Sequence, residues 1–183
     1  LVGSEMCIRD STYTTATTRC GGCSMRHMSY AAQLAAKTKQ VRDAFIRLGR
    51  FDGSEINAQP CHGMEHPETG HILIPRRTGD DIPCTCRFHQ SCVEGLASGP
   101  MLERRTGMKG KDIPADSPVW DLEAFYIAEA LVNYTMCYSV ERIVLGGGVM
   151  DNKFLFPMIR NYYTELLSGY IDMPQVKDTD TYI

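Results

Sequence analysis

The chain has 183 residues and a mass of 20.5 kDa, which fits one domain or one domain with an appendage. Hydrophobic residues make up 43% and charged residues 22%, and this balance excludes extended disorder; no stretch approaches the about 20 apolar residues of a membrane helix. The net charge of −3 gives no support for nucleic acid or an anionic membrane as a partner. The N-terminus has no signal-peptide pattern, so we expect a cytoplasmic protein.

The composition of the chain changes near residue 56. Residues 1–55 carry a net charge of +3, whereas residues 56–183 carry −6. The first part contains one helix-like stretch, Tyr30–Leu48, and little other periodic pattern. We therefore expect residues 1–55 to be an atypical, poorly structured leader and residues 56–183 to form the folded domain.

The elements expected in residues 56–183 alternate between short strands and longer helices. In chain order they are a strand at His71–Ile74, a helix at Val93–Arg105, a helix at Val119–Tyr138, a strand at Arg142–Leu145 and a helix at Phe154–Leu167. Both long helices are rich in apolar residues, and the strand between them is apolar. The order predicts an α/β domain in which Arg142–Leu145 is a central strand covered by helices.

Three carboxylates lie on the second of these helices. They are Asp121, Glu123 and Glu129. Because acidic side chains are rarely buried, we expect all three on the solvent-facing side of the helix.

A cluster of cysteine and histidine residues gives the strongest chemical signal. Cys86, His89 and Cys92 follow one another at three-residue spacing, and His71, at the end of a nearby segment, could be the fourth ligand. Two thiolates and two imidazoles suit a closed, tetrahedral structural zinc site. Cys84 competes with Cys86 for the same ligand position. The alternative is a set of buried free cysteines beside a surface histidine.

Two glutamates lie near this cluster in the sequence. Glu68 and Glu94 flank the cluster in sequence, and carboxylates there can accept hydrogen bonds from the hydroxyls of a sugar. From spacing alone, two solvated surface charges are the simpler interpretation.

Gly146, Gly147 and Gly148 stand between a strand-like and a helix-like segment, where a ligand can approach the backbone. An ordinary connecting turn explains this triglycine equally well.

Several of these segments together resemble fructokinases of the ROK family of sugar kinases. The matching segments, in family order, are His66–His71 (HPETGH), Cys86–Cys92, Glu94–Pro100 (EGLASGP), Pro118–Ala124 (PVWDLEA) and Ile143–Met150 (IVLGGGVM). The resemblance covers residues 56–183. The departures are Arg87, Gln90 and Ser91 inside the cysteine loop and the additional Cys84.

The resemblance implies a fold and an activity. The fold is the C-terminal part of an actin-like (ribonuclease H-like) ATPase with a zinc-bound loop. The activity is ATP-dependent phosphorylation of a hexose, D-fructose to fructose 6-phosphate, with Mg²⁺ accompanying ATP, in a homodimeric parent enzyme. It assigns sugar contacts to Glu68, His71 and Glu94. It assigns structural zinc to His71, Cys86, His89 and Cys92. It places Gly146, Gly147 and Gly148 near the nucleotide.

The resemblance also predicts what the chain lacks. The N-terminal domain of the family carries a glycine-rich phosphate loop and a catalytic aspartate, and residues 1–55 match neither. Leu1–Ser11 resembles translated sequencing-adaptor read-through, and Arg19–Glu55 a shifted reading frame. We therefore expect a fragment of a fructokinase that is inactive alone. The alternatives are a sugar-sensing transcriptional regulator of the same family and a non-catalytic zinc-binding module.

Overall fold

The structure is a computed structural model that describes residues 35–36, 38–39, 42–43, 46–47 and 67–183. The described residues between 35 and 47 are helical, and Lys39 Nζ lies 2.6 Å from Asp43 Oδ2 one turn away. The rest of the expected leader lies outside the described residues, so the boundary at residue 56 stays a prediction. Glu68–Ile183 belong to one compact unit, which is described below by itself.

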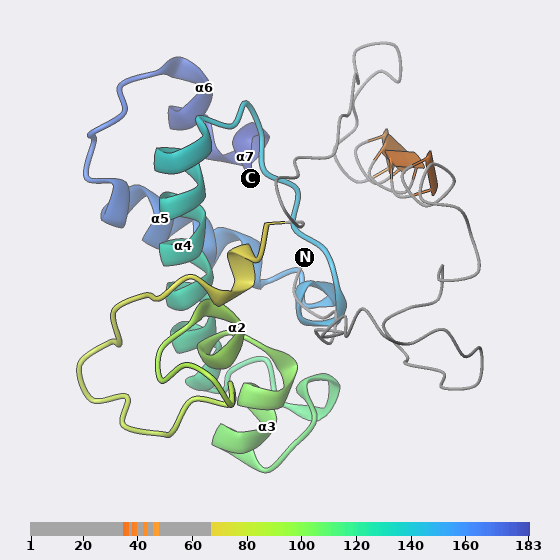
Figure 1. Cartoon of the computed structure of the whole chain (residues 1–183), viewed down its shortest axis with the longest axis vertical. Helices are drawn as coiled ribbons and strands as arrows, with labels where there is room; N and C mark the ends of the chain where they lie inside the picture. The colour runs from red at the N-terminus through yellow and green to blue at the C-terminus, as the bar shows by residue number, and fades with distance from the viewer. Residues whose placement is uncertain (1–34, 37, 40–41, 44–45, 48–66) are drawn as a thin grey trace, which may run out of the picture. The chain divides into compact units, whose positions relative to one another are not determined.

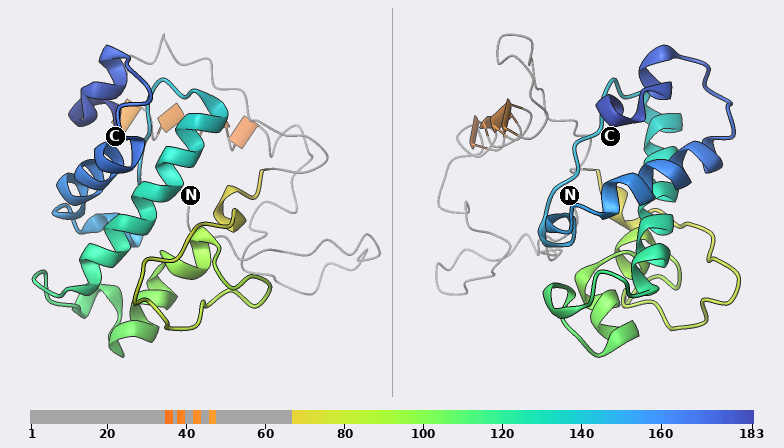
Figure 2. Two further views of the ribbon diagram at one scale, coloured as in Figure 1. Left: turned by 90° about the vertical axis from the view of Figure 1, so that its left-hand side faces the viewer. Right: turned by 180° about the vertical axis from the view of Figure 1, so that it is seen from behind.

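Two long helices organise this unit. Helix α4 spans Val119–Tyr138, and helix α5 spans Leu155–Leu167. Helix α5 packs along α4 (Figure 1), an arrangement that Figure 2 shows from two further sides. Each helix ends at a serine in the left-handed conformation, Ser139 at φ 47° and Ser168 at φ 53°, as is common at helix C-termini.

The remaining elements are short, and the α-helices among them lie toward the two ends of α4 (Figure 1). One end carries helices α2 and α3, and the other carries α6 and α7. The bounds of the short elements are Thr69–His71 for η1, Val93–Leu96 for α2, Gly99–Thr106 for α3, Gly110–Asp112 for η2, Gly148–Asp151 for η3, Pro174–Lys177 for α6 and Thr179–Tyr182 for α7.

Two clusters of buried apolar side chains hold the unit together. The larger one joins α4 and α5 through residues such as Trp120, Leu131, Ile159 and Tyr163. The smaller one joins α2 to the other side of α4 and contains Ile74, Val93, Leu96, Ala97, Tyr126 and Ala130. Helix α4 is therefore covered along more than one face, and α2 is fixed to it by apolar packing.

The expected strands are wrong for the described residues. Around His71–Ile74 there is a single isolated antiparallel bridge, between Leu73 and Cys92. The Arg142–Leu145 segment forms no strand; the N–H of Ile143 instead donates to the carbonyl of Tyr182 at 2.7 Å. A strand requires a neighbouring strand to pair with, and the described part of the chain offers none. In that part the unit is helical, and its two long helices pack on each other.

The helix expected over Val93–Arg105 is in fact two helices, α2 and α3. The break falls at Ala97 and Ser98, whose backbone leaves the helical region. The Ser98 hydroxyl accepts a hydrogen bond from the Met101 N–H at 3.4 Å, and Pro100 lies in the first turn of α3. A serine cap followed by proline starts a new helix, and this local signal outweighs the apolar periodicity.

The expectation that all three carboxylates of α4 face solvent is wrong for Glu123. The side chain of Glu123 is completely buried, because α4 is covered by neighbours on more than one side. Asp121 is about half exposed and forms an ion pair with Arg77 at 2.6 Å, whereas Glu129 is only partly exposed. Within the described residues, α4 and the other helices lack the combination of length and apolarity that a membrane span requires.

Candidate metal centre and adjoining carboxylates

The structure brings together the four residues that the sequence predicted as metal ligands. One donor atom each of His71, Cys86, His89 and Cys92 lies within 4.8 Å of all the others. The Sγ atom of Cys86 is 3.5 Å from His89 Nδ1 and 3.8 Å from His71 Nδ1. Cys92 Sγ is 3.7 Å from His71 Nδ1. We call these four residues the His/Cys cluster.

The spacing of the donor atoms fits a zinc ion. Tetrahedral bonds of about 2.3 Å to sulfur and about 2.0–2.1 Å to nitrogen place the two ligand atoms about 3.6 Å apart. The three sulfur–nitrogen distances, 3.5, 3.7 and 3.8 Å, lie close to this value. The cluster can therefore hold a metal such as Zn²⁺ with small adjustments, and its two thiols and two imidazoles are ligands that zinc prefers.

The structure separates the roles of Cys84 and Cys86. Cys86 belongs to the cluster, and Cys84 does not. The Cys84 thiol instead lies against the backbone of Gly95, where an added β-carbon would lie 1.9 Å from Sγ. Cys86 therefore occupies the ligand position for which Cys84 was the alternative, and Cys84 is a packing residue.

Three short segments carry the cluster. His71 is the last residue of η1, and Cys92 is the N-cap of α2. The bridge between Leu73 and Cys92 joins these two segments. The loop that carries Cys86 and His89 is tied to α2 by Thr85, whose N–H and hydroxyl both donate to the carbonyl of Gly95, at 3.0 Å and 3.2 Å.

Burial controls the protonation of the innermost thiol. The pKa of Cys92 is raised to about 12, chiefly by desolvation and also by the neighbouring Cys86, against a backbone hydrogen bond from Gly95 that lowers it. Without a cation this thiol therefore stays protonated at neutral pH. A bound metal would supply the positive charge that stabilises a buried thiolate.

A carboxylate adjoins the cluster on the far side of His71. The Nδ1 atom of His71 faces the two sulfurs, and its Nε2 atom lies 3.5 Å from Glu94 Oε2. The Glu94 side chain is 42% exposed, so it reaches solvent as well as the imidazole. The backbone of Gly70 lies beside the same carboxylate, since an added β-carbon there would be 3.6 Å from Oε2.

The other expected sugar-contact residue is on the same short element as His71. Glu68 is the exposed N-cap residue of η1, and its carbonyl accepts a hydrogen bond from the His71 N–H at 2.9 Å. The structure thus places Glu68, His71 and Glu94 on two adjoining elements, η1 and α2.

The triglycine lies on a different part of the unit. Gly146, Gly147 and Gly148 are all exposed, and Gly147 has φ 98°, a conformation that side chains other than glycine rarely adopt. The turn leads into η3, which packs against η2 rather than against η1 or α2. The predicted role of these glycines beside a nucleotide stays a prediction.

Sequence reasoning missed the arginines that hold the loop around the cluster. The Arg104 Nη1 donates to the carbonyls of Pro83 and Cys84, each at 2.9 Å. Arg105 donates to the carbonyl of Leu96 at 2.8 Å. Arg76 donates to the carbonyl of Gln90 at 3.2 Å. Their partners are 9 to 21 residues away in sequence, so no local pattern identifies these contacts.

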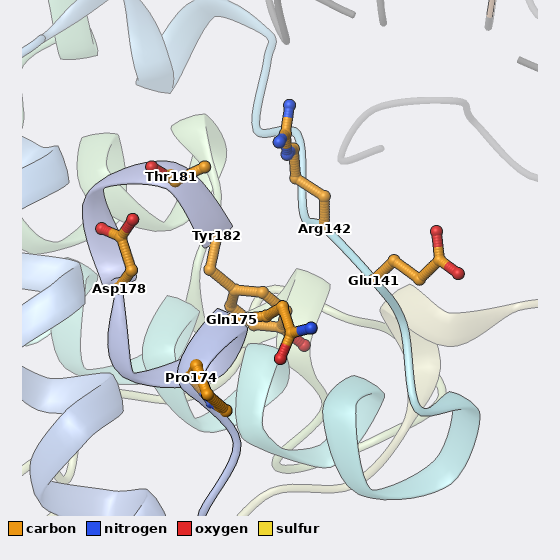
Figure 3. Close-up of a pocket in the computed structure, with 7 residues that line it drawn as sticks. All are labelled: Glu141, Arg142, Pro174, Gln175, Asp178, Thr181 and Tyr182. Carbon is orange, nitrogen blue, oxygen red and sulfur yellow. The ribbon is translucent and has the colours of Figure 1, made fainter. Parts of the chain in front are cut away.

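A concavity of about 350 Å³ lies apart from the cluster, between α6–α7 and the segment that follows α4 (Figure 3). Its lining includes Glu141, Arg142, Gln175 and Tyr182. None of the residues predicted to form a site contributes to it. The structure therefore does not connect this concavity with the cluster.

Comparisons with known proteins agree with the resemblance in sequence. The ROK family model matches residues 26–181. A fructokinase of Pediococcus pentosaceus is 46% identical over 82% of this chain and 53% of its own length, and a fructokinase of Streptococcus mutans is 42% identical over 73% and 46%. A much shorter match, 46% identical over 27% of this chain and 10% of the relative, is to an uncharacterized RNA methyltransferase of Clostridium tetani.

The family match and the two fructokinase matches each cover most of the chain, while the chain spans about half the length of these fructokinases. The match to the methyltransferase is too short to show a family. The chain belongs to the ROK family and is related to its fructokinases.

Proposed function

We propose that this chain supplies the sugar-contact residues, a structural zinc site and part of the nucleotide site of an ATP-dependent fructokinase, which converts D-fructose to fructose 6-phosphate. The observation that carries the proposal is the 46% identity to a fructokinase over 82% of the chain. The position of Glu94 beside His71, next to the His/Cys cluster, supports it independently.

In this proposal Glu68, His71 and Glu94 contact the sugar. Carboxylate oxygens accept hydrogen bonds from sugar hydroxyls, and an imidazole nitrogen can donate one or accept one. Glu68 is exposed and Glu94 is partly exposed, so a ligand in solvent can reach both. Two carboxylates that adjoin one imidazole can distinguish hexoses by the orientation of their hydroxyl groups, which is how these residues would favour fructose.

The cluster has a structural role in the same proposal. When bound, zinc would cross-link η1, the cysteine loop and the start of α2 without activating water, because all four positions are protein ligands. His71 would then belong to both the metal site and the sugar site. The cross-link would hold its imidazole in a fixed orientation for the sugar.

The triglycine would adjoin the nucleotide. Its backbone is exposed and free of side chains, so phosphate oxygens can approach the backbone N–H groups closely. Mg²⁺ bound with ATP would shield the phosphate charges. The actin-like ATPase fold of the family is part of this proposal. A cytoplasmic location and a homodimeric enzyme are part of the same proposal.

Phosphoryl transfer further requires a group that orients or deprotonates the attacking hydroxyl. The family's catalytic aspartate has no match in this sequence, and Glu68 and Glu94 are proposed to orient the sugar. We therefore expect the chain by itself to bind D-fructose without phosphorylating it.

Saturation-transfer NMR on the purified chain tests the binding, and coupled detection of ADP release with fructose, ATP and Mg²⁺ tests turnover. We expect a fructose signal that weakens in Glu68→Gln and Glu94→Gln and persists in Glu103→Gln, an exposed residue of α3, with no ADP release. Binding that survives both substitutions, or no binding at all, would refute the sugar site. Turnover that Glu68→Gln abolishes would show that the chain contains its own base.

A further inference from the structure

Helix α2 is too short to be stable by itself. It has four residues, Val93–Leu96, and a single helical turn does not repay the cost of its nucleation. Yet α2 carries Glu94, and its N-cap is Cys92 of the His/Cys cluster. Contacts from outside therefore hold the helix: apolar packing fixes it to α4, Thr85 binds the carbonyl of Gly95, and the metal cluster fixes its first end.

Arg105 holds the second end. From α3, its Nη1 donates to the carbonyl of Leu96 at 2.8 Å. This carbonyl is one of those that a helix C-terminus leaves without an intrahelical partner. The Arg105 side chain is 3% exposed, so little water competes for the bond.

Arg105 is itself held by a loop residue and by a residue of α4. Its Nη2 lies 2.8 Å from Asp80 Oδ2, and both side chains are 3% exposed. The same carboxylate oxygen accepts a hydrogen bond from the Tyr126 hydroxyl of α4 at 2.6 Å. The Arg105 guanidinium also lies over the Tyr126 ring, 5.5 Å from its centroid. These contacts form a continuous connection from α4 through Asp80 and Arg105 to the end of α2.

We propose that Arg105 is a positioning residue for the metal and sugar site, because it fixes the end of α2 and so holds Glu94 and Cys92 in register with His71. The fork of the guanidinium matters because it contacts Leu96 and Asp80 at once. A lysine has one ammonium group and no such fork, and in Arg105→Lys only part of the effect would be restored. The inference rests on the proposed zinc site, and for Glu94 on the proposed sugar site.

The test is the rate at which the zinc-loaded chain releases its metal to an excess of a colorimetric chelator. The variants are Arg105→Ala and Arg105→Lys, and the control is Arg160→Ala. Arg160 of α5 also binds a backbone carbonyl, that of Asp180 at 3.2 Å, and pairs with the Asp180 carboxylate at 2.8 Å, but it belongs to no part of the cluster. All chains are compared below the onset of unfolding, followed by circular dichroism.

We expect Arg105→Ala to release zinc about tenfold faster than the parent chain, the scale known for residues that support metal ligands. Arg105→Lys should lie between the two, and Arg160→Ala should match the parent even where its melting temperature is lower. Release from Arg105→Ala and Arg105→Lys at the parent rate would overturn the proposal and leave Arg105 a stabilising residue only. If Arg105→Ala does not fold, Arg105→Lys decides by the same criterion.

The outcome separates this inference from the proposed fructokinase activity. Metal release is measured without sugar or ATP, so a chain that fails to bind fructose can still support the role of Arg105 at the metal site. A parent chain that binds no zinc would refute the metal site and this inference with it, while fructose binding would still test the sugar site.

Discussion

The thiol of Cys84 lies directly against Gly95, so that a β-carbon added to Gly95 would be 1.9 Å from Sγ and 2.9 Å from Cys86 Cβ. Gly95 follows Glu94 in α2, and Cys86 belongs to the His/Cys cluster. The close approach of the two backbones therefore sets how near the cysteine loop comes to α2. Any side chain at position 95 must push the two segments apart.

This relationship predicts that Gly95→Ala destabilises the unit. The methyl group cannot be accommodated without moving the loop, since the nearest atoms include the backbone nitrogen of Cys86. We expect a loss of about 1–3 kcal/mol in the free energy of unfolding, the scale of overpacked cores. Urea denaturation measures it, and bound zinc should be released faster as well.

Gly99→Ala is the matched control for this substitution. A β-carbon at Gly99 would meet no atom within 4 Å other than those of its chain neighbours, and Gly99 begins α3. Its loss of stability should stay well below that of Gly95→Ala, because only the following Pro100 opposes a β-carbon there. Equal losses in the two variants would contradict the packing argument.

Glu123 predicts a pH dependence of stability. Burial raises its pKa to about 8, although Arg105 opposes the shift, and neither carboxylate oxygen has a hydrogen-bond partner. The folded state therefore holds a proton that the unfolded state loses near the ordinary pKa of a glutamate, 4.5. The folded state binds more protons between these pH values, so stability falls as pH rises from about 4.5 to about 8 and levels off above.

Glu123→Gln removes this titration while keeping the shape of the side chain. The difference in unfolding free energy between variant and parent should grow in the variant's favour from pH 5 to pH 8, by roughly a few kcal/mol. Denaturation at a series of pH values measures it, with the exposed Glu103→Gln as control. A difference that does not change with pH would contradict the assignment.

Arg77 joins its own loop to helices α4 and α5, and these contacts predict an energetic coupling. Its guanidinium pairs with Asp121 of α4 at 2.6 Å, donates to the Tyr162 hydroxyl of α5 at 3.1 Å, and lies 4.9 Å from the centroid of the Phe125 ring. Burial alone would raise the pKa of Asp121, but hydrogen bonds from Tyr162 and Arg77 outweigh it and lower the pKa.

We expect Arg77→Ala to lower the unfolding free energy by about 1–2 kcal/mol, because the partly exposed ion pair adds little and the stacking adds more. A double-mutant cycle with Tyr162→Phe should show a coupling of about 0.5 kcal/mol or more. Additive effects would mean that Arg77 and Tyr162 act independently, against the geometry described.

The sequence predicts the His/Cys cluster because its ligands are soft donors at regular spacing, and this signal is local. It predicts the extent of α4 because apolar residues persist between Val119 and Tyr138. It fails where tertiary contacts decide. The sequence predicts Glu123 on the surface, but other segments cover α4 and bury it. The contacts of Arg105 with Leu96 and Asp80 exist only in the folded structure, so the sequence does not reveal them.

The strand predicted at Arg142–Leu145 fails for a related reason. An apolar run followed by glycines is typical of a strand, but strand formation depends on a partner in space. Within the described residues the Ile143 N–H finds the carbonyl of Tyr182 instead. Local sequence sets how readily a segment forms a strand, but it does not provide the neighbouring strand that pairing requires.

We propose that His71, Cys86, His89 and Cys92 hold one zinc ion beside the proposed sugar site. Elemental analysis of the purified chain, with Cys86→Ser and Cys84→Ser in parallel, tests it most directly. We expect one zinc per chain in the parent and in Cys84→Ser, and a loss of affinity beyond about 100-fold in Cys86→Ser, since a direct ligand matters more than its supports. A parent chain without stoichiometric zinc, or Cys84→Ser losing the metal while Cys86→Ser keeps it, would contradict the account.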